Sequence, residues 1–338
     1  MKQSELPINP RNIPVGVVGL GLMGTSVATC LLAAGHPVAA VEIDANKRRT
    51  ARRRILNHLQ EMKREGLLRT DPGKVLARLQ VSENYAGLES SHLVVECVFE
   101  DLDVKKDVLR KVEAVISSKG IIGTNTSGIP VTVLQQGAHH PERIVGIHWA
   151  EPAHVTRFME IICGKETRPQ CAEYAAVLSR RWGKEPSIVK RDIRGFITNR
   201  CFYALLREAF YLVEAGYATV ADVDRSLRND LGYWITLAGP FRFMDLTGIP
   251  AYQAVMKDLF PELNCAQEVP DLMRKVVKSG AKGVSNAKGF YRYTPEQARR
   301  WEKRFMKFSY EIRALAQKYP EEMSNQKRKK SEVEGRPR

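Results

Sequence analysis

The chain has 338 residues, of which 43% are hydrophobic and 27% are charged, and its formal net charge is +15. A chain of this length fits two domains, and its composition excludes disordered, fibrous and collagen-like proteins. No apolar run reaches the roughly 18 residues that a membrane span needs, and the N-terminus lacks the pattern of a secretory signal, so we expect a cytoplasmic protein with no membrane partner.

Short apolar runs alternate with helical patterns in the first part of the chain. Val15–Gly19, a helical pattern that ends at Ala34, and Val38–Val41 form a strand–helix–strand unit. Later apolar runs are predicted strands as well: Leu93–Val98, Ile121–Thr124, Ile144–Ile147, Met159–Cys163 and Ser187–Val189. The alternation predicts an α/β fold with a doubly wound, Rossmann-type sheet over residues 1–189.

The pattern changes near residue 190, after which no strand alternation is found. Four segments read as helices: Phe196–Ala215, Val220–Leu231, Pro250–Phe260 and Glu268–Lys278. We therefore predict an all-α C-terminal domain over residues 190–318. Residues 319–338 are polar and basic without periodicity, which predicts a flexible tail.

Basic charge is concentrated in two places, a run of six cations between Lys47 and Arg54 and the C-terminal tail. Such charge favours an anionic partner, for example a phosphorylated cofactor or acyl-CoA, but a solvated helix face explains it equally well. A nucleotide- or nucleic-acid-binding protein without turnover is a further alternative. We expect no nucleic-acid partner, because no basic patch with interleaved aromatic residues and no nucleic-acid motif is present.

The cysteines point to a reducing environment. The chain has six of them, most lie in apolar stretches, and none forms a C-x-x-C pair. We therefore predict neither a disulfide framework nor a metal site.

A glycine-rich loop opens the first predicted helix. The sequence Gly19-Leu20-Gly21-Leu22-Met23-Gly24 matches G-x-G-x-x-G and follows a strand, which is the context that makes this pattern informative. The first glycine permits the tight turn, the second lets the backbone approach a pyrophosphate, and the third lets the helix pack on the strand. Glu42 ends the second strand, where a carboxylate accepts hydrogen bonds from ribose hydroxyls and repels a 2′-phosphate. The loop therefore predicts a dinucleotide site that favours NAD over NADP.

Candidate catalytic side chains follow or lie within three later strands. They are Ser127, His148 and Glu160, and parallel strands bring their ends together at one ligand crevice. A histidine is the usual acceptor of a hydroxyl proton at neutral pH. Glu160 would orient His148 if their two strands pair, and Ser127 could bind the substrate oxygen. A lone histidine is more often structural, and His154 is a rival.

Motifs spread over residues 13–293 indicate which role each of these candidates has. The segment DIRGFITNR at residues 192–200 resembles the signature of the L-3-hydroxyacyl-CoA dehydrogenase family. The segments VGVVGLGLMG, VVECVFEDLDVKK, NTSGIP, HWAEP, FMEII, GPFRFMDLTG and AKGFYRY resemble the family in the same order.

The resemblance implies a role for each matching residue. His148 falls on the catalytic base and Glu160 on its acidic partner, while Ser127 and Asn199 fall on residues that hold the substrate oxygen and the histidine. Gly19 to Gly24 and Glu42 fall on the NAD site, and Glu100 and Lys105 on further NAD contacts. The resemblance also implies fatty acid metabolism, a small-molecule substrate and a homodimer formed through the helical domain.

Four positions depart from the family pattern, one at the cofactor and three at positions that the resemblance assigns to CoA. Glu151 stands where the family has an asparagine that touches the cofactor, and an ionised carboxylate only accepts hydrogen bonds. The CoA-binding serine and lysine fall on His58 and Glu65, and a later lysine falls near Ser285. We predict NAD-dependent oxidation of an L-3-hydroxyacyl-CoA to the 3-oxoacyl-CoA, as the resemblance implies. The alternative that these departures leave open is the same chemistry on a free 3-hydroxy acid or sugar acid such as carnitine or gulonate.

Overall fold

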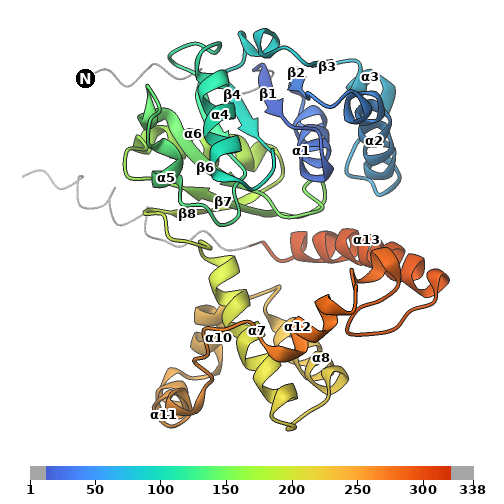
Figure 1. Ribbon diagram of the computed structural model, residues 1–338, viewed down its shortest axis with the longest axis vertical. Coiled ribbons are helices and arrows are strands. Elements are labelled where there is room, and N and C mark those ends of the chain that lie inside the picture. Colours follow the sequence, from blue (N-terminus) through green and yellow to red (C-terminus); the bar gives the residue numbers. More distant parts are fainter. Residues whose placement is uncertain (1–12, 321–338) are drawn as a thin grey trace, which may run out of the picture. The chain divides into compact units, whose positions relative to one another are not determined.

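The structure is a computed structural model and describes residues 13–320. The chain divides into two units, Met1–Leu205 and Leu206–Arg338 (Figure 1). The boundary between 189 and 190 that the sequence suggests stays a prediction. The predicted tail, from residue 321 on, lies outside the described residues.

An eight-stranded sheet with the strand order β3-β2-β1-β4-β5-β6-β7-β8 forms the centre of the first unit. All neighbouring strands are parallel except β6 and β7, which are antiparallel. The strands are β1 (Val15–Val18), β2 (Val38–Val41), β3 (Leu79–Ser82), β4 (Leu93–Glu96), β5 (Ile121–Thr124), β6 (Ile144–His148), β7 (Phe158–Ile162) and β8 (Glu185–Val189). The predicted α/β architecture is therefore confirmed. The sequence analysis missed β3, which pairs with β2 at the edge of the sheet and whose four residues alternate between apolar and polar.

Helices cover both faces of this sheet, which explains why its central strands are continuous apolar runs. Leu93 and Val95 of β4 belong to one hydrophobic cluster, and Val94 between them belongs to the other. The first cluster contains side chains from α1 and α6, and the second contains side chains from α4 and α5. The helices of this unit are α1 (Leu22–Ala33), α2 (Ala45–Arg64), α3 (Pro72–Leu76), α4 (Leu102–Glu113), α5 (Val131–Gln135) and α6 (Pro169–Arg181).

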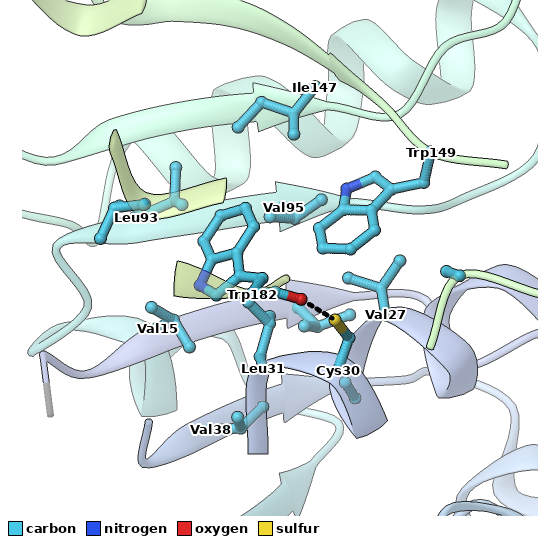
Figure 2. Packing of buried hydrophobic residues seen from close by; sticks show 14 of the residues in the cluster. Val15, Val27, Cys30, Leu31, Val38, Leu93, Val95, Ile147, Trp149 and Trp182 are labelled. Atoms are coloured by element: carbon cyan, nitrogen blue, oxygen red, sulfur yellow. Dashed lines mark hydrogen bonds between the residues drawn. The ribbon is translucent and has the colours of Figure 1, made fainter. Parts of the chain in front are cut away.

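The first cluster anchors the chain directly after β6. Figure 2 shows Trp149 and Trp182 in this cluster beside Val27 and Cys30 of α1. The two indole rings stack with their centroids 5.3 Å apart. Trp149 is the residue after His148, so packing in this core fixes where the end of β6 lies.

The basic run lies on α2, and part of it is structural. Ala51, Ile55, Leu59 and Met62 are the buried residues of this helix, at helical spacing. The Arg48 guanidinium donates to the carbonyl oxygens of Glu42 and Ile43, at 2.8 and 2.9 Å, and pairs with Glu83.

The second unit contains helices and, within residues 206–320, no named strand. Its helices are the later part of α7 (Thr198–Glu214), α8 (Val220–Asn229), α9 (Leu231–Trp234), α10 (Pro240–Thr247), α11 (Ile249–Leu259), α12 (Asp271–Lys278) and α13 (Pro295–Gln317). The sequence analysis missed α13, although its start carries a capping box between Thr294 and Gln297. None of the described helices combines the length and apolar character needed to cross a bilayer.

Candidate active site

His148 and Glu160 lie opposite each other on β6 and β7. The antiparallel register makes them direct partners, and Nδ1 of His148 lies 2.9 Å from Oε2 of Glu160. His148 is 7% exposed and Glu160 1% exposed. The expected pairing of these two strands is confirmed. Because Glu160 accepts at Nδ1, the neutral imidazole carries its proton there and leaves Nε2 as the basic nitrogen.

The second oxygen of Glu160 is also bound. Oε1 accepts the backbone N–H groups of Ile197 and Thr198, at 3.1 and 3.0 Å. Burial works to raise the pKa of Glu160, but the hydrogen bonds from His148 and from the backbone outweigh it and hold the pKa below its usual range. The carboxylate is therefore ionised and can stabilise an imidazolium.

Two phenylalanine rings pack against the His148 imidazole. The ring centroids of Phe158 and Phe196 lie 5.4 and 5.6 Å from it, both in edge-on geometry. Within residues 13–320, Nε2 of His148 has no hydrogen-bond partner. This nitrogen is available to exchange a proton with a ligand.

Ser127 and Asn199 lie side by side, but they contact through the backbone. The Asn199 side-chain amide donates to the carbonyl oxygen of Ser127 at 3.0 Å. Asn199 lies in the first turn of α7, and Ser127 follows β5 and is exposed. The structure therefore brings together all four predicted catalytic residues through β6, β7, the loop after β5 and the start of α7.

Glu100 and Lys105 form a network beside this loop, in which Lys105 is buried and Glu100 is exposed. Oε1 of Glu100 accepts from the Thr126 hydroxyl at 2.7 Å and from the Ser127 N–H at 2.8 Å. The Lys105 ammonium, 1% exposed, lies 2.8 Å from Glu96 and 3.2 Å from Glu100. Lys105 therefore pairs with two carboxylates. It is linked to the loop after β5 through Glu100, which accepts the Ser127 N–H. The direct NAD contacts of these two residues stay predictions.

The glycine loop fits a bound dinucleotide. A Cβ on Gly24 would lie 1.7 Å from the carbonyl oxygen of Gly19, so only glycine allows this close packing of α1 on the loop. Gly19 has a φ of +91°, which favours glycine. A Cβ on Gly21 would have nothing within 4 Å, and no side chain caps α1 there. A backbone with this clearance and N–H groups without a side-chain cap fit the binding of a pyrophosphate at this helix terminus.

The Glu42 carboxylate lies directly against this loop. Its oxygens accept the N–H of Leu20 at 2.8 Å and that of Asp44 at 2.9 Å. Each oxygen keeps a lone pair for a ribose hydroxyl, so the residue fits the expected role. Arg48, the cation of α2 that lies beside Glu42, is held by backbone carbonyls and Glu83 rather than being left for a 2′-phosphate.

Glu151 follows the paired histidine by three residues and is exposed. Desolvation raises its pKa, while an N–H of Ala153, the Ser26 hydroxyl and the charge of Lys184 oppose the rise. Ser26 is a residue of α1, the helix of the dinucleotide loop, so this helix is among the groups that influence the carboxyl. The chain therefore has a titratable carboxyl where the family has an amide.

His154, the rival histidine, belongs to a different cluster. Its Nδ1 lies 2.8 Å from the Ser26 hydroxyl, and its ring stacks on His58 at 4.3 Å. Burial lowers the pKa of His154 to about 3, so the ring is neutral at physiological pH. Burial also lowers the pKa of His58. The pair packs α1, α2 and the loop after β6 together.

Sequence reasoning gave no role of its own to Phe196 or to Asn125, although Asn125 lies in the candidate segment that contains Ser127. It placed Phe196 inside a helix, whereas α7 starts at Thr198 and Phe196 precedes it with a φ of +50°. The side-chain oxygen of Asn125 accepts the N–H of Trp149 at 2.9 Å and so ties the loop after β5 to the end of β6. The adjacent Gly195 was the available signal for an irregular turn at Phe196.

Family models match most of the chain. The model of the 3-hydroxyacyl-CoA dehydrogenase NAD binding domain matches residues 14–193, and that of the C-terminal domain of the same enzymes matches residues 195–293.

Individual relatives agree on the family and differ in substrate. A 5-formyl-3-hydroxy-2-methylpyridine 4-carboxylate 5-dehydrogenase of Mesorhizobium japonicum is 32% identical over 84% of this chain and 92% of its own length. A solved structure of an enzyme of that name, described as an NAD⁺-dependent dismutase, has a TM-score of 0.85 at 30% identity and covers 90% of this chain and 99% of its own. A probable 3-hydroxybutyryl-CoA dehydrogenase of Deinococcus radiodurans is 27% identical over 82% of this chain and 99% of its own length.

The family that these comparisons name is the one that the order of the motifs indicates. The Rossmann-type sheet and the glycine loop are the features expected of its NAD binding domain. The cofactor is NAD, and the chain is an oxidoreductase. It belongs to the 3-hydroxyacyl-CoA dehydrogenase family.

Proposed function

We propose that this protein oxidises the hydroxyl group of a small free hydroxy acid with NAD, and that His148 is the general base. The observation that carries the proposal is the His148–Glu160 hydrogen bond of 2.9 Å, which leaves Nε2 without a partner within residues 13–320. A histidine in this state takes a proton from a hydroxyl at neutral pH.

Each residue of the site has one task in this reaction. Nε2 of His148 takes the hydroxyl proton, and Glu160 stabilises the imidazolium that results. The Ser127 hydroxyl binds the substrate oxygen, and Asn199 holds the backbone of Ser127 in place. NAD, held by the glycine loop and Glu42, supplies the hydride acceptor when it is bound.

The residues at the positions that correspond to CoA contacts support a free acid as the substrate. His58 and Glu65 stand where the family resemblance places a serine and a lysine. The pKa of His58 is lowered by burial, so its ring offers no cation to a phosphate, and Glu65 would repel one. The Mesorhizobium relative is named for a free pyridine carboxylate rather than for a CoA ester.

A second candidate substrate is an L-3-hydroxyacyl-CoA, oxidised to the 3-oxoacyl-CoA by the same residues. The Deinococcus relative is named for such a substrate. Arg53 and Arg54 on α2 are exposed and could bind the phosphates of CoA in place of the missing lysine.

A panel of substrates followed at 340 nm, with NAD and NADP in parallel, separates these candidates. It contains 3-hydroxybutyryl-CoA, 3-hydroxybutyrate, carnitine, gulonate and the pyridine carboxylate named above. We expect NADH formation with a free acid. Turnover of the CoA ester alone would establish the second candidate, and no turnover together with salt-sensitive retention on heparin would favour a nucleotide- or nucleic-acid-binding protein.

A homodimer is part of the proposal. Among residues 206–320 only Ala238, Ala298 and Tyr310 are buried, while Phe241 and Phe260 are 79% and 60% exposed. Exposed apolar surface of this kind is usually covered by association. Sedimentation velocity at several concentrations is expected to show a dimer, and a monomer at every concentration would contradict this part.

A further inference from the structure

Glu160 is held at both of its oxygens. Oε2 contacts His148, and Oε1 accepts the N–H groups of Ile197 and Thr198. Thr198 is the first residue of α7. Glu160, a residue of β7, therefore occupies the place of a capping carboxylate at the N-terminus of a helix far away in sequence.

The turn before α7 directs these two N–H groups at one point. Gly195 and Phe196 both have positive φ angles, +81° and +50°. A bulky residue in this region is an outlier, and backbone strain of this kind is concentrated at functional sites. Successive N–H groups that follow such a turn converge on an anion. Position 196 is nevertheless occupied by phenylalanine, whose buried ring packs edge-on against His148 at 5.6 Å.

We propose that Phe196 is a positioning residue of the active site. Its left-handed backbone aims two N–H groups and the N-terminus of α7 at Oε1 of Glu160, while its ring holds the His148 imidazole. The two N–H groups stabilise the negative charge of Glu160. The carboxylate is therefore less basic and stabilises a protonated His148 less strongly. Glu160 remains the charged partner, but His148 can still lose its proton. The catalytic meaning of this arrangement rests on the function proposed above, whereas the electrostatic effect does not.

Three charged side chains on adjoining elements are bound elsewhere. Asp192 accepts from the backbone and hydroxyl of Thr132, and Arg157 pairs with Glu185 at the start of β8. Arg200, in the first turn of α7, reaches the carbonyl oxygen of Arg194. Apart from His148, the groups that act on the Glu160 charge are the backbone N–H groups of Ile197 and Thr198.

Replacing Thr198 by proline removes one of the two donors. Proline is tolerated at the first position of a helix, where its missing N–H costs no helical bond. Thr198→Ala is the matched control, because it removes the same side chain and keeps the N–H. Loss of one hydrogen bond to a charged group changes a proton equilibrium by about tenfold, which is about one pKa unit.

The measurement is an NMR titration of the His148 imidazole in the full chain without substrate. We expect the pKa of His148 to be higher in Thr198→Pro than in Thr198→Ala, because Glu160 becomes more basic and holds the imidazolium more tightly. Coincident titrations of the two folded variants would overturn the proposal.

A second pair of variants decides the question if Thr198→Pro does not fold. Phe196→Gly keeps the positive φ, whereas Phe196→Val disfavours it, and both lack the ring. We expect the pKa of His148 to be higher in the valine variant, with melting temperature and NADH fluorescence reporting on the fold of both. Equal titrations in this pair would also overturn the proposal. A protein that turns over no hydroxy acid but shows these shifts would refute only the proposed function.

Discussion

The two units differ in how much apolar surface they bury. The α/β unit contains two hydrophobic clusters, and strands such as β1, β4 and β6 are buried along their whole length. In the helical unit, the described parts of α8, α10, α11 and α12 contain no buried residue. The first unit thus holds side chains in place by its own packing, which an active site requires. The second unit exposes apolar side chains, and surface of this kind is usually buried by association with another protein surface.

The largest expected effect tests whether the general base of the reaction lies in the α/β unit. His148→Gln should lower kcat by about 10²- to 10⁴-fold, because the general base is lost, while NADH binding persists. His139→Gln is the control, since this histidine is exposed on a loop. Stopped-flow and steady-state assays measure the change, and near-normal turnover would remove His148 from the proposed role.

The next effect concerns a buried charge of the same unit. Lys105→Met leaves the carboxylate of Glu96, 0% exposed, without its cation and should reduce the free energy of unfolding by about 3–5 kcal/mol. Lys106→Met, its less buried neighbour, is the control. Urea denaturation measures both variants, and equal midpoints would show that the network is not needed for stability.

Two truncations of an apolar side chain, one in each unit, compare the two units directly. Ile122→Ala in β5, fully buried, should cost about 2–5 kcal/mol at any protein concentration. Val277→Ala on α12 removes a side chain that is 58% exposed, so its cost should be within about 0.5 kcal/mol in dilute protein and grow as the chains associate. Thermal unfolding over a hundredfold range of concentration checks this, and a large cost of Val277→Ala in dilute protein would refute the contrast.

A smaller effect separates two glycines of the cofactor loop. Gly24→Ala brings a Cβ against the Gly19 carbonyl and should cost about 1–3 kcal/mol of stability as well as NADH affinity. Gly21→Ala meets no atom of the protein and should weaken NADH binding with little change in the melting temperature. A Gly21→Ala protein with full NADH affinity would show that the pyrophosphate lies elsewhere.

The smallest effect is a pH dependence at Glu151. Desolvation raises the pKa of this carboxyl, so the folded state prefers the protonated form. The associated stability is present below the ordinary glutamate pKa and is lost as the pH rises through the raised value. Glu151→Gln should therefore have a higher melting temperature than the wild type at pH 7 and an equal one near pH 3. A difference of the opposite sign at pH 7 would mean that the Ser26 and Lys184 interactions outweigh desolvation.

The sequence predicted those parts of the fold that depend on local pattern. Buried parallel strands are continuous apolar runs and were found, whereas β3, at the sheet edge, has no such run. The glycine loop was found as well, because the roles of Gly19 and Gly24 follow from backbone geometry alone. For Lys105 the family resemblance implied an NAD contact. Its ion pairs with Glu96 and Glu100 are seen only in the folded chain.

What the sequence determined by itself was the class of fold, the dinucleotide loop and the candidate residues, since each follows from periodicity, spacing or an ordered series of motifs. The tertiary structure decided how these residues act on one another. The register of β6 and β7 puts His148 opposite Glu160, and the turn at Phe196 brings the start of α7 to the same carboxylate. These contacts join segments far apart along the chain, and sequence spacing carries no information about the distances between them.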